Sequence, residues 1–443
     1  MYELLCASAR GSSHVKEDTP CQDYGMVYET EGCKIFVVAD GHGDGDCPRS
    51  NYGSQKACEI AVKELEQFFK DIKKEGWESK LLKMGKGYNS IIRQLITSII
   101  ANWSATVNED YENNPLTELE RAKCKNYTER YDKGERIEHA YGTTIIAGLM
   151  TEDYLLLIQQ GDGRCDVFDA KGIVSMPIPW DDKCFANVTT SMCDVDAIQR
   201  CRFHVVDMKR NPVIAVMAGS DGVEDSFLTL EQMHTFYREK LEFASEHSVT
   251  ELKEELENLL PEFSLKGSGD DVTICGIIDS ERVKECIPTF HRENEIADLE
   301  SQIKVIDDRL SSLTTSMGEK KTQSLKEKSD SLIAEYNRLE EKVESLATEY
   351  DETKQRITDE DSDSFNIIRD IQNKLSSRSA KLALKLLELQ EEIDATKENL
   401  EDVSIEKDNA GTEYESRIEM RQQFEKEKAE AEARLEELKA ESY

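Results

Sequence analysis

The sequence predicts an α+β domain followed by a long all-α arm, and three observations support this. Its 443 residues exceed what one compact core usually holds. All 8 Pro, all 12 Cys and all 3 Trp lie at or before Pro288, and Gly318 and Gly411 are the only glycines after it. The remainder is rich in Glu, Lys, Leu, Ser and Ala, which is typical of a long exposed helix. We therefore predict domains at 1–284 and 285–443.

Short apolar runs that end in Gly or Asp predict β-strands in the first domain. Two of these runs, 34–39 and 213–218, lead directly into loops that contain Asp-Gly. Four others are separated only by short polar turns, which predicts an antiparallel meander. Those four runs are 143–150, 154–160, 165–170 and 173–178.

Two helices are expected between the strands, at 54–70 and 88–107. Each places apolar side chains at the spacing of one helical face. The faces comprise Ala57, Ala61, Leu65 and Phe68 in the first helix, and Ile92, Leu95, Ile99 and Trp103 in the second. Such amphipathic helices are suited to cover a sheet.

The arm carries the alternating three- and four-residue spacing of a left-handed coiled coil. Its first seam contains Ile296, Leu299, Ile303, Ile306, Leu310, Leu313 and Met317. Seven polar positions at 358–364 interrupt the pattern, and the seams on the two sides have similar lengths. This symmetry favours an antiparallel helical hairpin about 100 Å long that turns at 358–364. A parallel homodimer remains the alternative.

Charge and hydropathy exclude several classes of partner. A net charge of −35 argues against nucleic acid, because phosphate binding needs clustered Lys and Arg. No window approaches the ~18 apolar residues of a membrane span, so a cytoplasmic protein is expected. The cysteines have irregular spacing and no CxxC pair, which fits a reducing compartment without a structural zinc.

Aspartates at the predicted strand ends are the candidate functional groups. Asp40, Asp162, Asp221 and the Asp270-Asp271 pair each border a glycine and an apolar run. Carboxylates and backbone carbonyls suit Mg²⁺ and Mn²⁺, and two such ions can align a water with a phosphoryl group. Taken singly, each Asp-Gly is also ordinary turn chemistry. Likewise, the nearby histidine, His42, could be only a loop residue.

Seven blocks of sequence, in order, resemble the PPM or type 2C family of metal-dependent serine/threonine protein phosphatases, especially its divergent bacterial branch. They span residues 8–25, 37–44, 141–145, 159–164, 185–192, 217–223 and 267–274, and include VVADGHGD and GSGDDVTI. The resemblance covers about residues 1–280. It implies two antiparallel sheets sandwiched between helices, and a phosphorylated protein as substrate.

The resemblance also implies a binuclear Mn²⁺ or Mg²⁺ site. Asp40 matches the aspartate that bridges both ions, and the Gly41 carbonyl matches a ligand of the second ion. Asp221 and Asp270 match ligands of the first ion. Asp162 matches the aspartate associated with a third, weaker ion. The sequence does not choose between Mn²⁺ and Mg²⁺, because both accept these oxygen ligands.

Two further positions are implied to act in catalysis. Asp23 matches an acid that orients the attacking water, and His42 resembles the residue that protonates the leaving serine or threonine oxygen. The chain departs from the family at Gln22, where many relatives have Glu. It also departs from the family in that the family's phosphate-binding arginine has no secure counterpart here. The phosphate-binding residue therefore stays unknown, with three candidates in one loop: Arg10, His14 and Lys16.

Three hypotheses about the function follow. The first is an active phosphatase whose coiled coil serves as a targeting, oligomerisation or regulatory arm, by self-association or by binding another protein. The second is a pseudophosphatase, a scaffold that binds phosphoproteins without turnover, which Gln22 and the missing arginine motivate. The third is a structural coiled-coil protein with an incidental head.

Overall fold

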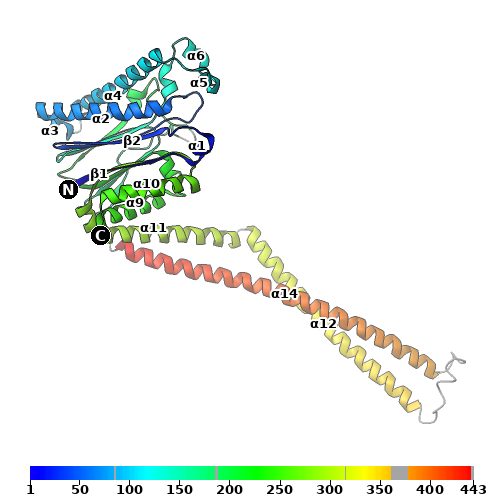
Figure 1. The fold of residues 1–443 in the computed structure, drawn as a ribbon. Coiled ribbons are helices and arrows are strands. Elements are labelled where there is room, and N and C mark those ends of the chain that lie inside the picture. Colours follow the sequence, from blue (N-terminus) through cyan, green and yellow to red (C-terminus); the bar gives the residue numbers. More distant parts are fainter. Residues whose placement is uncertain (84–85, 185–187, 315, 361–377, 441–443) are drawn as a thin grey trace. The chain divides into compact units, whose positions relative to one another are not determined.

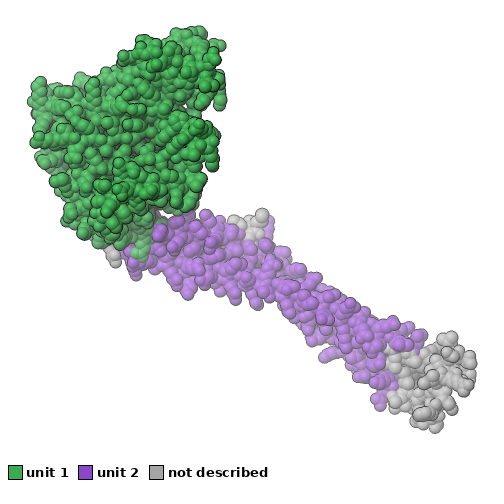
Figure 2. Space-filling view, viewed as in Figure 1, with its two compact units in different colours: residues 1–297 green, residues 298–443 purple. Residues whose placement is uncertain are grey.

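The computed structural model describes the chain except residues 84–85, 185–187, 315, 361–377 and 441–443. The chain forms two compact units, Met1–Ala297 and Asp298–Tyr443, which Figure 2 distinguishes by colour. The helix α11 (Ser280–Thr314) belongs to the first unit at its start and to the second at its end. The boundary expected between residues 284 and 285 therefore falls within this helix and stays a prediction.

The first unit is built on two five-stranded antiparallel sheets, which confirms the predicted fold class. One sheet has the order β1-β10-β9-β6-β7, and the other β2-β3-β4-β5-β8. The strands of the first sheet are β1 (Tyr2–Ala9), β10 (Val272–Asp279), β9 (Val213–Gly219), β6 (Arg164–Asp169) and β7 (Val174–Ser175). Those of the second are β2 (Asp23–Thr30), β3 (Cys33–Asp40), β4 (Ile145–Met150), β5 (Tyr154–Gln160) and β8 (Arg202–Asp207).

Helices cover the outer faces of both sheets, as Figure 1 shows. The long helices are α2 (Ser50–Glu75), α4 (Lys86–Asn113), α9 (Leu230–Glu246) and α10 (Val249–Lys266). The helices α2 and α4 extend the two predicted helices at both ends, and their buried Leu65 and Trp103 pack with the second sheet. The helices α9 and α10 bury Tyr237 and Leu252 against the first sheet. A third apolar core, which includes Phe36, lies between the sheets.

Short helices connect these layers and shape the ends of the sandwich. They are α1 (Ser12–Glu17), α3 (Glu78–Leu81), α5 (Glu118–Lys123), α6 (Thr128–Asp132), η1 (Ile137–Tyr141), α7 (Ala197–Arg200) and α8 (Asp221–Glu224). The capping box of Thr117 and Glu120 starts α5, because the Thr117 side chain accepts from the Glu120 N–H and Glu120 accepts in return.

The predicted four-strand meander is wrong at its centre. The strands β4 and β5 do pair, but β5 then pairs with β8 while β6 pairs with β9 in the other sheet. The turn between β5 and β6 includes Gly161 at φ +108°, a conformation that favours glycine, and it carries the chain from one sheet to the other. The last predicted strand shortens to Val174–Ser175.

The second unit contains the predicted antiparallel hairpin. The helices α12 (Ser316–Glu360) and α14 (Arg378–Ala440) lie side by side, and Leu346, Leu389 and Ile393 form a small apolar cluster between them. Ion pairs between the two helices follow the antiparallel order. Lys321 near the start of α12 pairs with Glu413, whereas Lys342, further along α12, pairs with Glu392, which is nearer the start of α14. The expected turn at 358–364 lies largely outside the described residues, which stop at 360 and resume at 378. None of the described helices is long and apolar enough to cross a bilayer.

Candidate active site

One cavity of about 780 Å³ collects six of the seven residues predicted to form the site. They come from the end of β3, the β5–β6 turn, the start of α8 and the loop before β10. These lining residues are Asp40, Gly41, His42, Asp162, Asp221 and Asp270. The seventh, Asp23, is buried and lies opposite Asp40 in the β2–β3 register.

Backbone hydrogen bonds hold Asp40 at the end of β3. Its N–H donates to Thr144 Oγ1 at 3.1 Å, and its carbonyl accepts from the Thr143 hydroxyl and the Thr144 N–H at 2.9 and 2.8 Å. A Cβ at Gly41 would lie 2.7 Å from the Ser50 carbonyl oxygen, so only glycine fits this turn. The Asp40 carboxylate is thus placed by the strand rather than by a mobile loop.

The adjacent residues Asp270 and Asp271 have different surroundings. Asp270 is half-exposed and lines the cavity. The buried Asp271 accepts hydrogen bonds from the backbone N–H groups of Gly11 and Gln22 at 2.5 and 2.6 Å, and the His14 ring lies 2.9 Å away. Asp271 therefore joins the β10 start to the first loop, while Asp270 is left for the cavity.

The cavity concentrates negative charge. Of the described residues that line it, eight are aspartates and none is Lys or Arg. Burial, together with Asp221 and Asp23, raises the pKa of Asp40 well above its usual value. Burial and the neighbouring Asp162 raise the pKa of Asp221 to about 7, although a hydrogen bond with Asp40 opposes the shift. This crowded set of oxygen donors fits hard divalent cations, which would relieve the mutual repulsion.

Asp23 lies behind the cavity as a buried acid, 6% exposed. Burial raises its pKa to about 8, and hydrogen bonds with Ser220 and Thr273 oppose this shift. Its Oδ2 atom has no hydrogen-bond partner among the described residues. A buried carboxylate oxygen without a partner is costly, and a water held at the site would satisfy it.

His42 is held at the cavity wall by its backbone, whose N–H donates to the Gly142 carbonyl at 3.1 Å. A Cβ at Gly142 would lie 2.6 Å from the His42 ring, so the ring is tightly flanked. Burial and the nearby His139 lower the pKa of His42 to about 4. The imidazole is therefore neutral at pH 7 in the unliganded protein.

The two departures from the family have structural consequences. The Gln22 amide nitrogen donates to the His42 carbonyl at 3.2 Å and to Ser50 Oγ at 2.6 Å, so it braces the loop after β3. The three candidate phosphate-binding residues, Arg10, His14 and Lys16, are all absent from the cavity lining. Arg10 instead donates to the His14 carbonyl and pairs with Asp18.

Several lining residues were not predicted from the sequence. Asp44, Asp46, Asp194 and Asp225 complete the acidic lining, and the first two could have been suspected from their place in the DGHGDGD run. The rings of His139 and Tyr127 also line the cavity and stack with centroids 3.8 Å apart. No local pattern marks this stack, because Tyr127 reaches the site only through the fold of residues 114–136.

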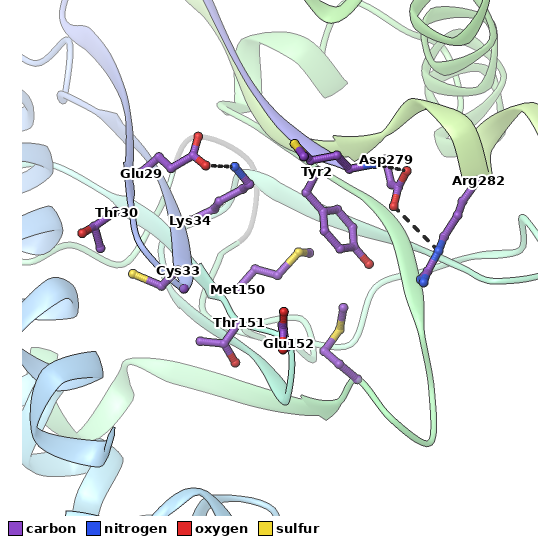
Figure 3. A pocket seen from close by; sticks show the side chains of 13 residues that line it. Tyr2, Glu29, Thr30, Cys33, Lys34, Met150, Thr151, Glu152, Asp279 and Arg282 are labelled. Carbon is purple, nitrogen blue, oxygen red and sulfur yellow. Dashed lines mark hydrogen bonds and ion pairs between the residues drawn. The ribbon is translucent and has the colours of Figure 1, made fainter. Parts of the chain in front are cut away.

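A second cavity, of about 510 Å³ (Figure 3), shares no described lining residue with the first. Two pairs of its charged groups interact with one another, Lys34 with Glu29 and Arg282 with Asp279. It lacks the concentrated carboxylates of the first cavity, which is therefore the candidate active site.

Solved structures of bacterial phosphatases resemble part of this chain. Serine/threonine phosphatase Stp1 from Staphylococcus aureus is 16% identical, with a TM-score of 0.39, over 63% of this chain and 95% of that one. The S. agalactiae serine/threonine phosphatase is 15% identical, with a TM-score of 0.38, over 63% of this chain and 99% of that one. The catalytic domain of the phosphatase PstP, solved with two manganese ions, is 15% identical, with a TM-score of 0.36, over 63% of this chain and 99% of that one. No curated protein sequence matches this chain significantly.

The sequence profile of the protein phosphatase 2C family matches residues 10–261, which is more than half of the chain. The matched range includes β2, β3 and β9 and most of the cavity lining. The chain therefore belongs to the protein phosphatase 2C family.

Proposed function

We propose that this chain hydrolyses phosphoserine and phosphothreonine in proteins, using two Mn²⁺ or Mg²⁺ ions. The observation that carries the proposal is the convergence of Asp40, Asp162, Asp221 and Asp270 in one cavity without a Lys or Arg among its described lining residues. Such a cavity would repel a phosphate unless cations were bound. When bound, two divalent ions would neutralise phosphoryl oxygens and activate a water for in-line attack.

The residues that would hold the ions are Asp40, the Gly41 carbonyl, Asp221 and Asp270, with Asp162 as the place for a third, weaker ion. Asp162 accepts a hydrogen bond from Thr189 at 2.7 Å, which orients its carboxylate. Burial raises the pKa of Asp162, so a nearby cation would favour its ionised form.

Asp23 and His42 would act on protons. The unpartnered Asp23 oxygen would accept a hydrogen bond from the attacking water and orient it. His42, neutral in the unliganded protein, would take up a proton when the dianionic phosphoryl group enters beside it, because a nearby negative charge raises an imidazole pKa. It would then donate that proton to the leaving oxygen.

The test is hydrolysis of a phosphothreonine peptide by the full chain with Mn²⁺ and with EDTA. We expect turnover that needs the metal and is lost in Asp40→Asn and Asp221→Asn. The matched control is Asp182→Asn, at an exposed aspartate outside the cavity, and it should retain full activity. Equal activity with EDTA and with Mn²⁺ would contradict the proposal.

A second candidate function is binding of phosphoproteins without turnover. It is favoured by the lack of an Arg among the described lining residues and by Gln22, whose amide braces the loop where many relatives have an acid. Metal-dependent binding of the peptide by folded wild-type protein, without release of phosphate, would support this alternative over hydrolysis.

The arm is proposed as a targeting, oligomerisation or regulatory element. Cys286 and Phe290 of α11 pack in the core of the first unit, so a shortened chain should end after Ala297 rather than earlier. We expect that chain to keep hydrolysis of a small aryl phosphate. Loss of hydrolysis in a folded 1–297 chain would instead give the arm a part in catalysis.

A further inference from the structure

A segment that contains α5 and α6, residues 114–136, is fixed against the loop that carries His42. Asp46 of this loop accepts hydrogen bonds from the backbone N–H groups of Lys125 and Asn126 at 2.6 and 2.9 Å, and its carbonyl accepts from the Tyr131 hydroxyl. Burial would raise the pKa of Asp46, but these N–H donors bring it below its usual value. The ionised Asp46 therefore holds the segment in place.

Arg49 anchors the other end of the segment. Its guanidinium pairs with Glu120 at 2.7 Å and donates to the carbonyls of Asn114 and Pro115. The backbones also approach closely, since a Cβ at Gly45 would lie 2.5 Å from the Lys123 carbonyl oxygen. With both ends held, Asn126 and Tyr127 form part of the cavity wall.

Part of this segment, residues 121–136, is rich in charge of the opposite sign to the cavity. Residues 121–136 contain six Lys or Arg and three Asp or Glu, in a chain whose net charge is −35. Three of these cations flank the wall residues, and we call them the basic rim: Lys123, Lys125 and Arg130. All three are exposed, and within the part of the chain that the structure describes they make no ion pair. The Arg130 guanidinium lies 5.0 Å from the centroid of the Tyr127 ring.

We propose that the basic rim selects substrates whose phosphorylated residue is flanked by acidic residues. This inference rests on the proposed function. Eight aspartates keep an acidic peptide chain out of the cavity, so only the phosphoryl group would enter, with its cations. The flanking residues would then lie at the mouth, beside Lys123, Lys125 and Arg130. Complementary charge at the edge of a site steers association and favours the matching partner.

The experiment compares two phosphothreonine peptides of equal length, one with Asp and Glu flanks and one with Asn and Gln flanks, together with a small aryl phosphate. We expect the full-length wild type to have a higher kcat/KM for the acidic peptide. The charge reversal Lys123→Glu with Lys125→Glu should lower that preference about tenfold through KM, since it reverses two exposed charge interactions. Hydrolysis of the aryl phosphate should not change.

The matched control reverses two other exposed lysines, Lys63 and Lys74 of α2, to Glu. They lie about 20 Å and about 36 Å along the helix from its first residue, Ser50, which is next to the site loop. This variant has the same net charge, so it should keep the preference for the acidic peptide. In the wild type the preference should shrink between 50 and 500 mM salt, because screening weakens exposed charge interactions.

Equal kcat/KM for the two peptides, in a wild type that hydrolyses the aryl phosphate, would overturn the rim proposal and leave the proposed function intact. A preference that the control variant also loses would overturn it too, because net charge would then be the cause. If no substrate is hydrolysed, the proposed function fails. Peptide binding, measured by fluorescence anisotropy, then tests the proposal about the basic rim. Tighter binding of the acidic peptide, lost in the Lys123 and Lys125 variant alone, supports it, and equal binding overturns it.

Discussion

Phe290 is the side chain of α11 whose removal should weaken the first unit most clearly. It is fully buried, packs edge-on against Phe168 with ring centroids 5.9 Å apart, and lies close to Gly172. Truncating a buried Phe to Ala costs about 3–5 kcal/mol, because apolar burial and packing are both lost. The free energy of unfolding falls by about 3 kcal/mol per molar urea, so a loss of about 4 kcal/mol of stability lowers the urea midpoint of unfolding by about 1.3 M.

The assay is urea unfolding of full-length Phe290→Ala, followed by tryptophan fluorescence. All three tryptophans lie in the first unit, so this probe does not respond to the arm directly. The control is Leu228→Ala, because Leu228 is 92% exposed and its loss should cost less than about 0.5 kcal/mol. Similar midpoints for the two variants would refute the reasoning that α11 completes this core.

Four further predictions concern the cavity and the arm. The melting temperature of the metal-free protein should fall as the pH rises from about 4 to about 7, because Asp221 keeps its proton up to about pH 7 when folded but not when unfolded. Mn²⁺ should restore that stability. A melting temperature that rises over this range would contradict the prediction. Asp40→Asn should raise the melting temperature of the metal-free protein at pH 8 while abolishing hydrolysis, since it removes a buried repulsion. Gln22→Glu removes two hydrogen bonds donated by the amide, so it should reduce the free energy of unfolding by about 1–3 kcal/mol and lower the melting temperature of the metal-free protein. An unchanged melting temperature would show that the amide does not brace the loop. In the arm, Leu389→Asp with Ile393→Asp should reduce the circular dichroism of helix at 222 nm but leave the tryptophan unfolding curve unchanged.

Much of the candidate site could be predicted because its chemistry is local in sequence. Asp40 and Asp221 each follow an apolar strand within one or two residues, so the strand fixes where the carboxylate lies. The arm was predictable for a similar reason, since its a/d spacing repeats in sequence and its two halves have similar lengths. Asp40 and Asp221 line one cavity, and their roles stay predictions.

Other features were decided by contacts between distant segments. The sequence alone determined an α+β head with strand-end aspartates and a helical arm, because strand and helix periodicity are properties of neighbouring residues. It favoured a hairpin for the arm but left a parallel homodimer open. Only the tertiary structure decided that β5 and β6 belong to different sheets, because hydrogen-bond partners such as β8 come from elsewhere in the chain. It also decided that Tyr127 reaches the cavity wall, because Asp46 and Arg49 bind a segment some 70–80 residues further along the chain. Those pairings depend on long-range geometry, which no local pattern encodes.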